Sequence, residues 1–116
     1  MTWHRVARSE ELVEGEWKIV LVAGKRIGVV RREGACYAVL DICPHAGAPV
    51  CRGRLTGRVT CDDRHRVGYD PHAHTLRCPW HRWEFDLASG HGVAAIRQKL
   101  KTYPVRVAGA DIEVQV

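Results

Sequence analysis

No stretch of the chain is apolar over the roughly 18 residues that a membrane-spanning helix requires. The first fifteen residues, MTWHRVARSEELVEG, are mixed and charged, so the apolar core of a secretory signal is also missing. Internal repeats and low-complexity tracts are absent, and 116 residues leave room for one domain. These absences favour a cytoplasmic protein, in which cysteines are kept reduced.

An even set of cysteines is lacking as well. The chain has five cysteines, Cys36, Cys43, Cys51, Cys61 and Cys78, and an odd number argues against a disulfide framework. Thiols in a cytoplasmic protein more often serve metals or catalysis.

The net charge of +5 favours acidic partners. The cations are scattered, however, without the basic helix or aromatic–basic strand that would indicate nucleic-acid binding.

Helical periodicity is scarce, and only SEELVEG and VAAIRQK suggest a helical turn. Short runs of alternating apolar and polar residues are common instead, and turn residues separate them. They occur at 17–23, 26–31, 36–41, 103–107 and 111–116, and the opening WHRVAR adds another. The pattern predicts an all-β domain of short antiparallel strands.

The segment 43–92 differs from this frame. It contains six of the seven histidines, four of the five cysteines and much of the glycine and proline. The strand signal is weak, at TGRVTC, TLRCP and WEFD. We expect such a segment to bury little apolar surface, so that a metal centre would have to order it.

Two short motifs in this segment pair a thiol with an imidazole: Cys43-Pro44-His45 and Cys78-Pro79-Trp80-His81. Proline stiffens each loop and removes one N–H, which leaves those of the following residues free to point at a bound group. Small residues, including Gly47, allow a close approach of the backbone. Two thiolates and two imidazoles suit either a tetrahedral zinc ion or a [2Fe–2S] cluster with two histidines on one iron.

The motif C-x-H followed by C-x-x-H, with proline after each cysteine, resembles that of the Rieske iron–sulfur proteins. The flanking LDICPHAGAPVCRGRL and CPWHRWEFDLASG are similar too, and the resemblance covers most of the chain. It implies a single Rieske domain, 1–116, of antiparallel β-sheets, with a small cluster-binding subdomain at about 43–92 inserted in the base domain. Cys43 and Cys78 would bind the inner iron, and His45 and His81 the outer one.

The resemblance also implies a function. The chain would be a soluble ferredoxin, a one-electron carrier without a substrate of its own, between a reductase and an oxygenase or related redox enzyme. The high-potential respiratory members have a disulfide across the cluster, at positions that are Ala48 and Trp80 here. Their hydroxyl donors correspond to Trp83 and Phe85. Without these groups we expect a reduction potential at the low end of the Rieske range, on the order of −150 mV.

The sequence departs from the family pattern in two places. The spacer between the two motifs, 46–77, is longer than usual and contains an insert at about 58–75. Arg82 follows the second histidine where glycine is common, and a cation beside the exposed cluster edge would favour an acidic docking surface on the redox partner.

Several further residues admit two interpretations. The insert's potential ligands suggest a second metal site, but an exposed hairpin with surface histidines is the expected reading; they are Cys61, His65, Asp70, His72 and His74. Cys36 is expected in the core, Cys51 and Cys61 as unpaired thiols, and His91 in a turn. Trp80 and Trp83 are expected to shield the cluster from water.

Three rival functions stay open at this point. The chain could be a small Rieske subunit of a larger oxidoreductase, such as a nitrite reductase. A structural Cys₂His₂ zinc module would use the same four side chains. A nucleic-acid-binding β domain rests only on the positive charge.

Overall fold

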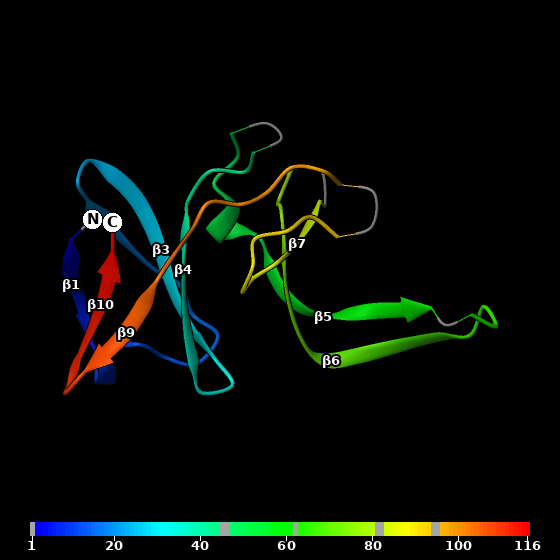
Figure 1. Cartoon of the computed structure of the whole chain (residues 1–116), viewed down its shortest axis with the longest axis horizontal. Helices are drawn as coiled ribbons and strands as arrows, with labels where there is room; N and C mark the ends of the chain where they lie inside the picture. Colours follow the sequence, from blue (N-terminus) through cyan, green and yellow to red (C-terminus); the bar gives the residue numbers. More distant parts are fainter. Residues whose placement is uncertain (1, 45–46, 62, 81–82, 94–95) are drawn as a thin grey trace.

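The computed structural model describes residues 2–44, 47–61, 63–80, 83–93 and 96–116, and strands dominate it (Figure 1). The strands are β1 (Trp3–Arg8), β2 (Lys18–Val22), β3 (Lys25–Arg32), β4 (Ala35–Leu40), β5 (Arg54–Cys61), β6 (Val67–Arg77), β7 (Glu84–Asp86), β8 (Thr102–Tyr103), β9 (Val105–Ala108) and β10 (Asp111–Gln115). Two short 3₁₀ helices, η1 (Ser9–Glu11) and η2 (Val50–Arg52), complete the described elements. The all-β prediction is confirmed, and none of the described helices could span a bilayer.

The strands form three antiparallel sheets, in the orders β1-β10-β9, β2-β3-β4-β8 and β5-β6-β7. The turns that join β2 to β3 and β3 to β4 are two residues long. All four turn residues, Ala23, Gly24, Glu33 and Gly34, have positive φ. This backbone matches the twist of a two-stranded hairpin, which explains the glycine in each turn.

The four-stranded sheet lies between two apolar cores. Ile27, Val29 and Ala38 pack with β1 and β10 in one core, whereas Val30 and Val39 belong to the other. Neighbouring residues of a strand point to opposite faces, so the alternating runs of the sequence supply both cores. The base of the fold and the segment 43–92 therefore share one central sheet.

The segment 43–92 has a core of its own, contrary to the expectation from its composition. Val50, Leu76, Phe85 and Leu87 are at most 1% exposed. They pack with Cys43 and Cys78 in the second core. The prediction that this segment buries little apolar surface was wrong, because a few large side chains converge there from elements far apart in the sequence.

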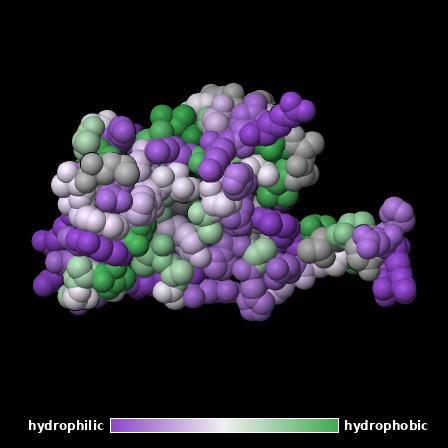
Figure 2. Space-filling view, in the orientation of Figure 1, coloured by the Kyte–Doolittle hydropathy of each residue, from purple (hydrophilic) through white to green (hydrophobic). Residues whose placement is uncertain are grey.

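The insert forms a bent hairpin. Arg54–Thr56 pair with Thr75–Arg77, but beyond a register shift Arg58 pairs with Asp70. Most of residues 71–74 therefore have no counterpart on β5, and this bulge bends the hairpin. The outer part, residues 58–70 (the hairpin arm), projects from the body (Figures 1 and 2). The arm matches the predicted exposed hairpin, although β6 is far longer than its weak strand signal indicated.

One end of the expected insert is packed rather than exposed. Thr75 is fully buried, and His74 shows only 13% of its side chain to solvent. His74 lies near Tyr37, whose hydroxyl is 3.1 Å from His74 Nδ1. The exposed part of the insert is thus shorter than 58–75.

A carboxylate on the β3–β4 turn holds the inner end of the insert. Glu33 Oε1 lies 2.9 Å from His72 Nδ1, and Glu33 Oε2 lies 3.2 Å from His74 Nε2. The hydrogen bond from His72, followed by that from His74, lowers the pKa of Glu33. The same bond, with the charge of Glu33, raises the pKa of His72, and Asp70 adds to this effect.

The contact between Glu33 and His72 has a defined pH window. His72 has a raised pKa in the folded chain, so its contribution is complete below the ordinary histidine value and is lost as the pH rises through the raised one. Glu33 has a lowered pKa, so its contribution is lost only as the pH falls through that value. The contact is therefore strongest in mildly acidic solution.

NMR titration of the histidine rings tests this contact. We expect His72 to titrate above the ordinary histidine value, and Glu33→Gln to lower its pKa toward that value, with Asp70 still raising it. Glu16→Gln, at an exposed carboxylate outside this contact, is the matched control and should leave His72 unchanged. An unchanged His72 titration in Glu33→Gln would show that the two side chains do not pair in solution.

Shortening the hairpin arm tests whether it stabilises the fold. Replacing residues 59–69 by Asn-Gly keeps Arg58, Asp70 and the strand pairing of the inner hairpin, and removes one hydrogen bond to it, from the N–H of Gly57 to the Tyr69 hydroxyl. Because the arm buries no large apolar side chain among its described residues, we expect Tm to change by less than about 3 °C, and the metal content to stay the same. Leu76→Ala in the buried inner hairpin should instead destabilise the fold by about 2–5 kcal/mol. A large loss of Tm on shortening would make the arm a structural element.

Candidate metal centre

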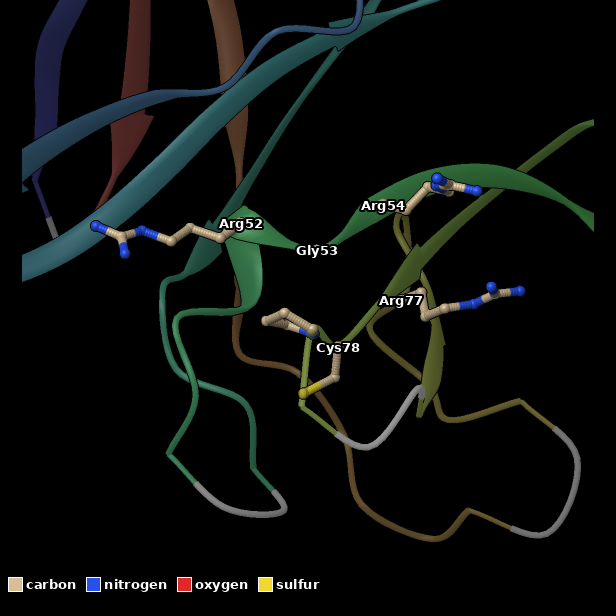
Figure 3. Close-up of a pocket in the computed structure, with 6 residues that line it drawn as sticks. Arg52, Gly53, Arg54, Arg77 and Cys78 are labelled. Atoms are coloured by element: carbon tan, nitrogen blue, oxygen red, sulfur yellow. The ribbon is translucent and has the colours of Figure 1, made fainter.

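The two Cys/His motifs lie on loops that are closed in the same way. The N–H of Cys43 donates to the carbonyl of Ala48 at 2.8 Å, and the N–H of Cys78 donates to that of Trp83 at 2.7 Å. Each predicted cysteine ligand therefore opens a six-residue loop whose ends are held together by its own backbone. In Figure 3 the Cys78 thiol points to the side on which both loops lie, away from the Arg54 and Arg77 side chains.

Both cysteines are buried in the same apolar core. Cys43 is 1% exposed and Cys78 is fully buried, and Ala48 and Phe85 are in contact with this core. None of the five cysteines forms a disulfide. Two buried thiols at the start of matching loops fit a soft metal centre, because bound iron would stabilise thiolates that an apolar core alone would disfavour. The predicted histidine ligands, His45 and His81, lie outside the described residues.

The first loop uses one backbone donor internally. The N–H of Gly47 donates to the carbonyl of Cys43 at 2.9 Å, and Gly47 has a φ of 74°. The expectation that the N–H groups of this loop are all free to face a bound group was therefore wrong for Gly47. The glycine is needed here for its left-handed backbone, which lets the loop turn back on itself.

A buried carboxylate braces the entry to the first loop, and the sequence analysis missed it. Asp41 is 4% exposed; it accepts the N–H of Cys51 at 2.9 Å and a guanidinium hydrogen bond from Arg26 at 3.1 Å. Burial, followed by the charge of Asp41, raises the pKa of the Cys51 thiol, which keeps it protonated. Cys51 is thus a core residue whose backbone N–H ties the end of the first loop to Asp41. The signal that could have indicated this was the acidic residue directly after a buried strand.

The second loop is followed by a similar brace. Asp86 accepts hydrogen bonds from the backbone N–H and the hydroxyl of Ser89, at 2.9 and 2.8 Å, and from Arg58 at 3.2 Å. Burial alone would raise the pKa of Asp86, but these donors outweigh it and lower the pKa. Asp86 is therefore a charged structural group that ties β7 to the turn behind it and to β5.

The aromatic residues around the second loop differ in exposure. Trp83 is half-buried against the core, with its ring centroid 6.5 Å from that of the buried Phe85. Trp80 is 58% exposed, so only Trp83 matches the expected shielding role. Arg82 lies outside the described residues.

The remaining candidates do not assemble a second metal site. Cys61 and His65 lie on the hairpin arm, whereas His72 and His74 face Glu33. In the described part of the chain no group of three histidine, cysteine or acidic side chains could hold a metal ion. The backbone N–H of the exposed His91 donates to Ser89 Oγ at 3.2 Å. His91 lies just after the turn in which it was expected and forms an isolated bridge with Lys99. Cys36 is partly buried on β4.

Comparisons with known proteins agree with this arrangement. The Rieske [2Fe-2S] domain family matches residues 2–104. The ferredoxin component of a naphthalene 1,2-dioxygenase system from Pseudomonas aeruginosa is 29% identical over 98% of this chain and 95% of its own length.

Solved structures agree with the fold. The ferredoxin of carbazole 1,9a-dioxygenase from Nocardioides aromaticivorans IC177 has a TM-score of 0.78 at 27% identity, with 98% of this chain and 97% of that chain covered. A putative nitrite reductase small subunit also has a TM-score of 0.78, over the whole of both chains, but at 21% identity it shows the fold alone. The two buried cysteines, their matching loops and the family match over most of the chain agree, and the chain belongs to the Rieske [2Fe–2S] domain family.

Proposed function

We propose that the protein is a Rieske-type ferredoxin: a cytoplasmic one-electron carrier that takes electrons from a reductase and passes them to an oxygenase or a related redox enzyme. The observation that carries the proposal is the pair of buried cysteines on matching loops, in a chain similar over nearly its whole length to ferredoxin components of oxygenase systems. The chain itself is not an enzyme, since an electron carrier needs no substrate pocket.

The proposed ligands are Cys43 and Cys78 on the inner iron and His45 and His81 on the outer one. The bound [2Fe–2S] cluster supplies a site that gains and loses a single electron. The chain positions its donors through the loop hydrogen bonds and excludes water on the cysteine side with the apolar core. The cytoplasmic location is part of the same proposal, since five cysteines without a disulfide suit a reducing compartment.

We propose one Rieske domain for 1–116, with the cluster-binding subdomain at about 43–92 inserted in the base. The shared central sheet supports a single domain, since one face of it packs on each core. The hairpin arm is then an extension of the subdomain.

Two alternatives are less well supported. A nitrite reductase subunit shares the fold, but that likeness is at 21% identity, whereas the ferredoxin relatives reach 29%. A structural zinc module would need the same four ligands, and metal analysis separates it from the ferredoxin directly.

Iron and acid-labile sulfide analysis, with an EPR spectrum after dithionite reduction, tests the function. We expect two irons and two sulfides per chain and a reduced signal whose average g lies below the free-electron value. His45→Ala and His81→Ala should each lose the cluster, because an iron would lose one of its protein ligands.

His91→Ala is the matched control, since His91 is an exposed histidine of the same subdomain. It should keep the full spectrum. Stoichiometric zinc in protein purified without oxygen, or an unchanged cluster in both ligand variants, would overturn the assignment.

Phe85→Tyr tests the expected low potential. Phe85 is fully buried in the core that holds Cys43 and Cys78, at the position where high-potential relatives are expected to have a hydroxyl donor. A hydrogen bond to a cysteine sulfur of about 0.5–1.5 kcal/mol would favour the reduced state and raise the potential by about 20–60 mV. Protein-film voltammetry measures the shift, and Phe85→Leu controls for repacking of the core. An unchanged potential in Phe85→Tyr would mean that this position does not reach a ligand sulfur.

A further inference from the structure

A basic hollow lies beside the second ligand loop. Its volume is about 740 Å³, and its lining comes from three segments, the end of η2, the start of β5, and the junction of β6 with the loop: Arg52, Gly53, Arg54, Arg77, Cys78 and Pro79 (Figure 3). Because Cys78 is both a lining residue and a proposed iron ligand, the hollow adjoins the metal centre through a single residue.

Two of the three arginines carry uncompensated charge. Arg77 donates to the carboxylate of Glu84 at 3.1 Å, so its charge is largely neutralised. Arg52 and Arg54 are exposed, and neither side chain has an ion pair or a hydrogen bond to the residues that the structure describes. The hollow therefore presents a net positive surface next to a proposed iron ligand, Cys78.

The chain segments that carry these arginines contact each other through their backbones. A Cβ atom on Gly53 would collide with the carbonyl oxygen of Arg77, so the two chain segments are in direct contact. Arg54 and Arg77 are also opposite each other in the β5–β6 ladder. The arginine Cα positions are consequently fixed relative to the second loop, and a group bound to them would be held at a constant distance from it.

The directions of the side chains indicate what such a surface can bind. In Figure 3 the Arg54 and Arg77 side chains run one way and that of Arg52 runs the opposite way. The three guanidinium groups do not converge on one point, so a small anion could not contact all of them. Several carboxylates spread over the surface of a protein would match this arrangement, because arginine forms bidentate pairs with carboxylates.

The geometry points to a docking site: Arg52 and Arg54 bind carboxylates on the surface of the redox partner and thereby bring its acceptor group close to the second ligand loop. This inference rests on the proposed function and adds to it the residues and the chemistry of the partner's surface. In the docked complex one electron leaves the reduced ferredoxin and enters the partner's oxidised centre. No proton is transferred, and no bond is formed or broken.

Stopped-flow electron transfer tests the site with two acceptors of opposite charge. The dithionite-reduced holoprotein, freed of excess reductant, is mixed with oxidised cytochrome b5, whose haem edge is ringed by carboxylates, or with the basic cytochrome c. The variant is Arg52→Glu with Arg54→Glu. Its matched control is Lys25→Glu with Lys101→Glu, which makes the same change in net charge at exposed lysines of the base.

We expect the Arg52/Arg54 variant to reduce cytochrome b5 at least about tenfold more slowly than the wild type at low salt. The rate of the lysine control should fall much less. Added salt should remove the difference, and the variant should lose no rate toward cytochrome c. Negative charge beside the metal centre makes the reduced protein a stronger donor, so a slower reaction cannot come from a change in driving force. An unchanged visible spectrum checks that the variant is intact, and Arg52→Gln with Arg54→Gln should show an intermediate effect.

Two results would contradict these proposals in different ways. If the Arg52/Arg54 variant and the lysine control slow equally, net charge alone steers the partner and the docking site is wrong, while the electron-carrier function stands. If the reduced wild type transfers electrons to neither cytochrome, the electron-carrier function itself is overturned, and the docking site with it.

Discussion

The contact between the backbones of Gly53 and Arg77 is the constraint on which the metal centre depends. The two proposed ligand cysteines, Cys43 and Cys78, are 35 positions apart in the sequence, and their loops must meet for both to bind one cluster. Gly53 follows the first loop and η2, and Arg77 immediately precedes Cys78. A side chain at position 53 would collide with the Arg77 carbonyl, so glycine is what allows β5 to start directly against the end of β6.

The core around the cysteines is built on this contact. Leu76 and Phe85 are opposite each other on β6 and β7, and both are fully buried with the two thiols. Asp41 and Asp86 then tie the outer ends of the two loops to neighbouring elements through hydrogen bonds. Apolar side chains thus surround the two thiols, and the hydrogen-bonded carboxylates of Asp41 and Asp86 hold the outer ends of the loops.

Much of the fold could be predicted from the sequence because its signals are local. The alternating runs at 17–23, 26–31 and 36–41 became β2, β3 and β4 within one or two residues at each end. The cysteine burial could also be anticipated, since the two motifs have a specific spacing and proline after each cysteine. The assignment of all four ligands is still a proposal, because the histidines are outside the described residues.

Features that depend on distant partners could not be predicted. The Asp41–Cys51 hydrogen bond and the Glu33–His72 contact join residues without a shared local pattern. The length of β6 was missed because a glycine, an aspartate and a proline interrupt its strand signal, and pairing with β5 outweighs these weak preferences. The segment 43–92 appeared poor in apolar residues, yet a few large side chains suffice when they meet in one place.

The bent hairpin has a consequence for how the protein behaves at high concentration. On the N-terminal side of Thr75, the edge of β6 that faces away from β5 pairs with no strand in the described part of the chain. An open edge of this length is a template on which another polypeptide could add a strand. Pro71 lies in the middle of this edge, where it offers no N–H, and the bulge around it interrupts the regular spacing of donors and acceptors. A second copy would therefore find no continuous ladder to extend along this edge of β6.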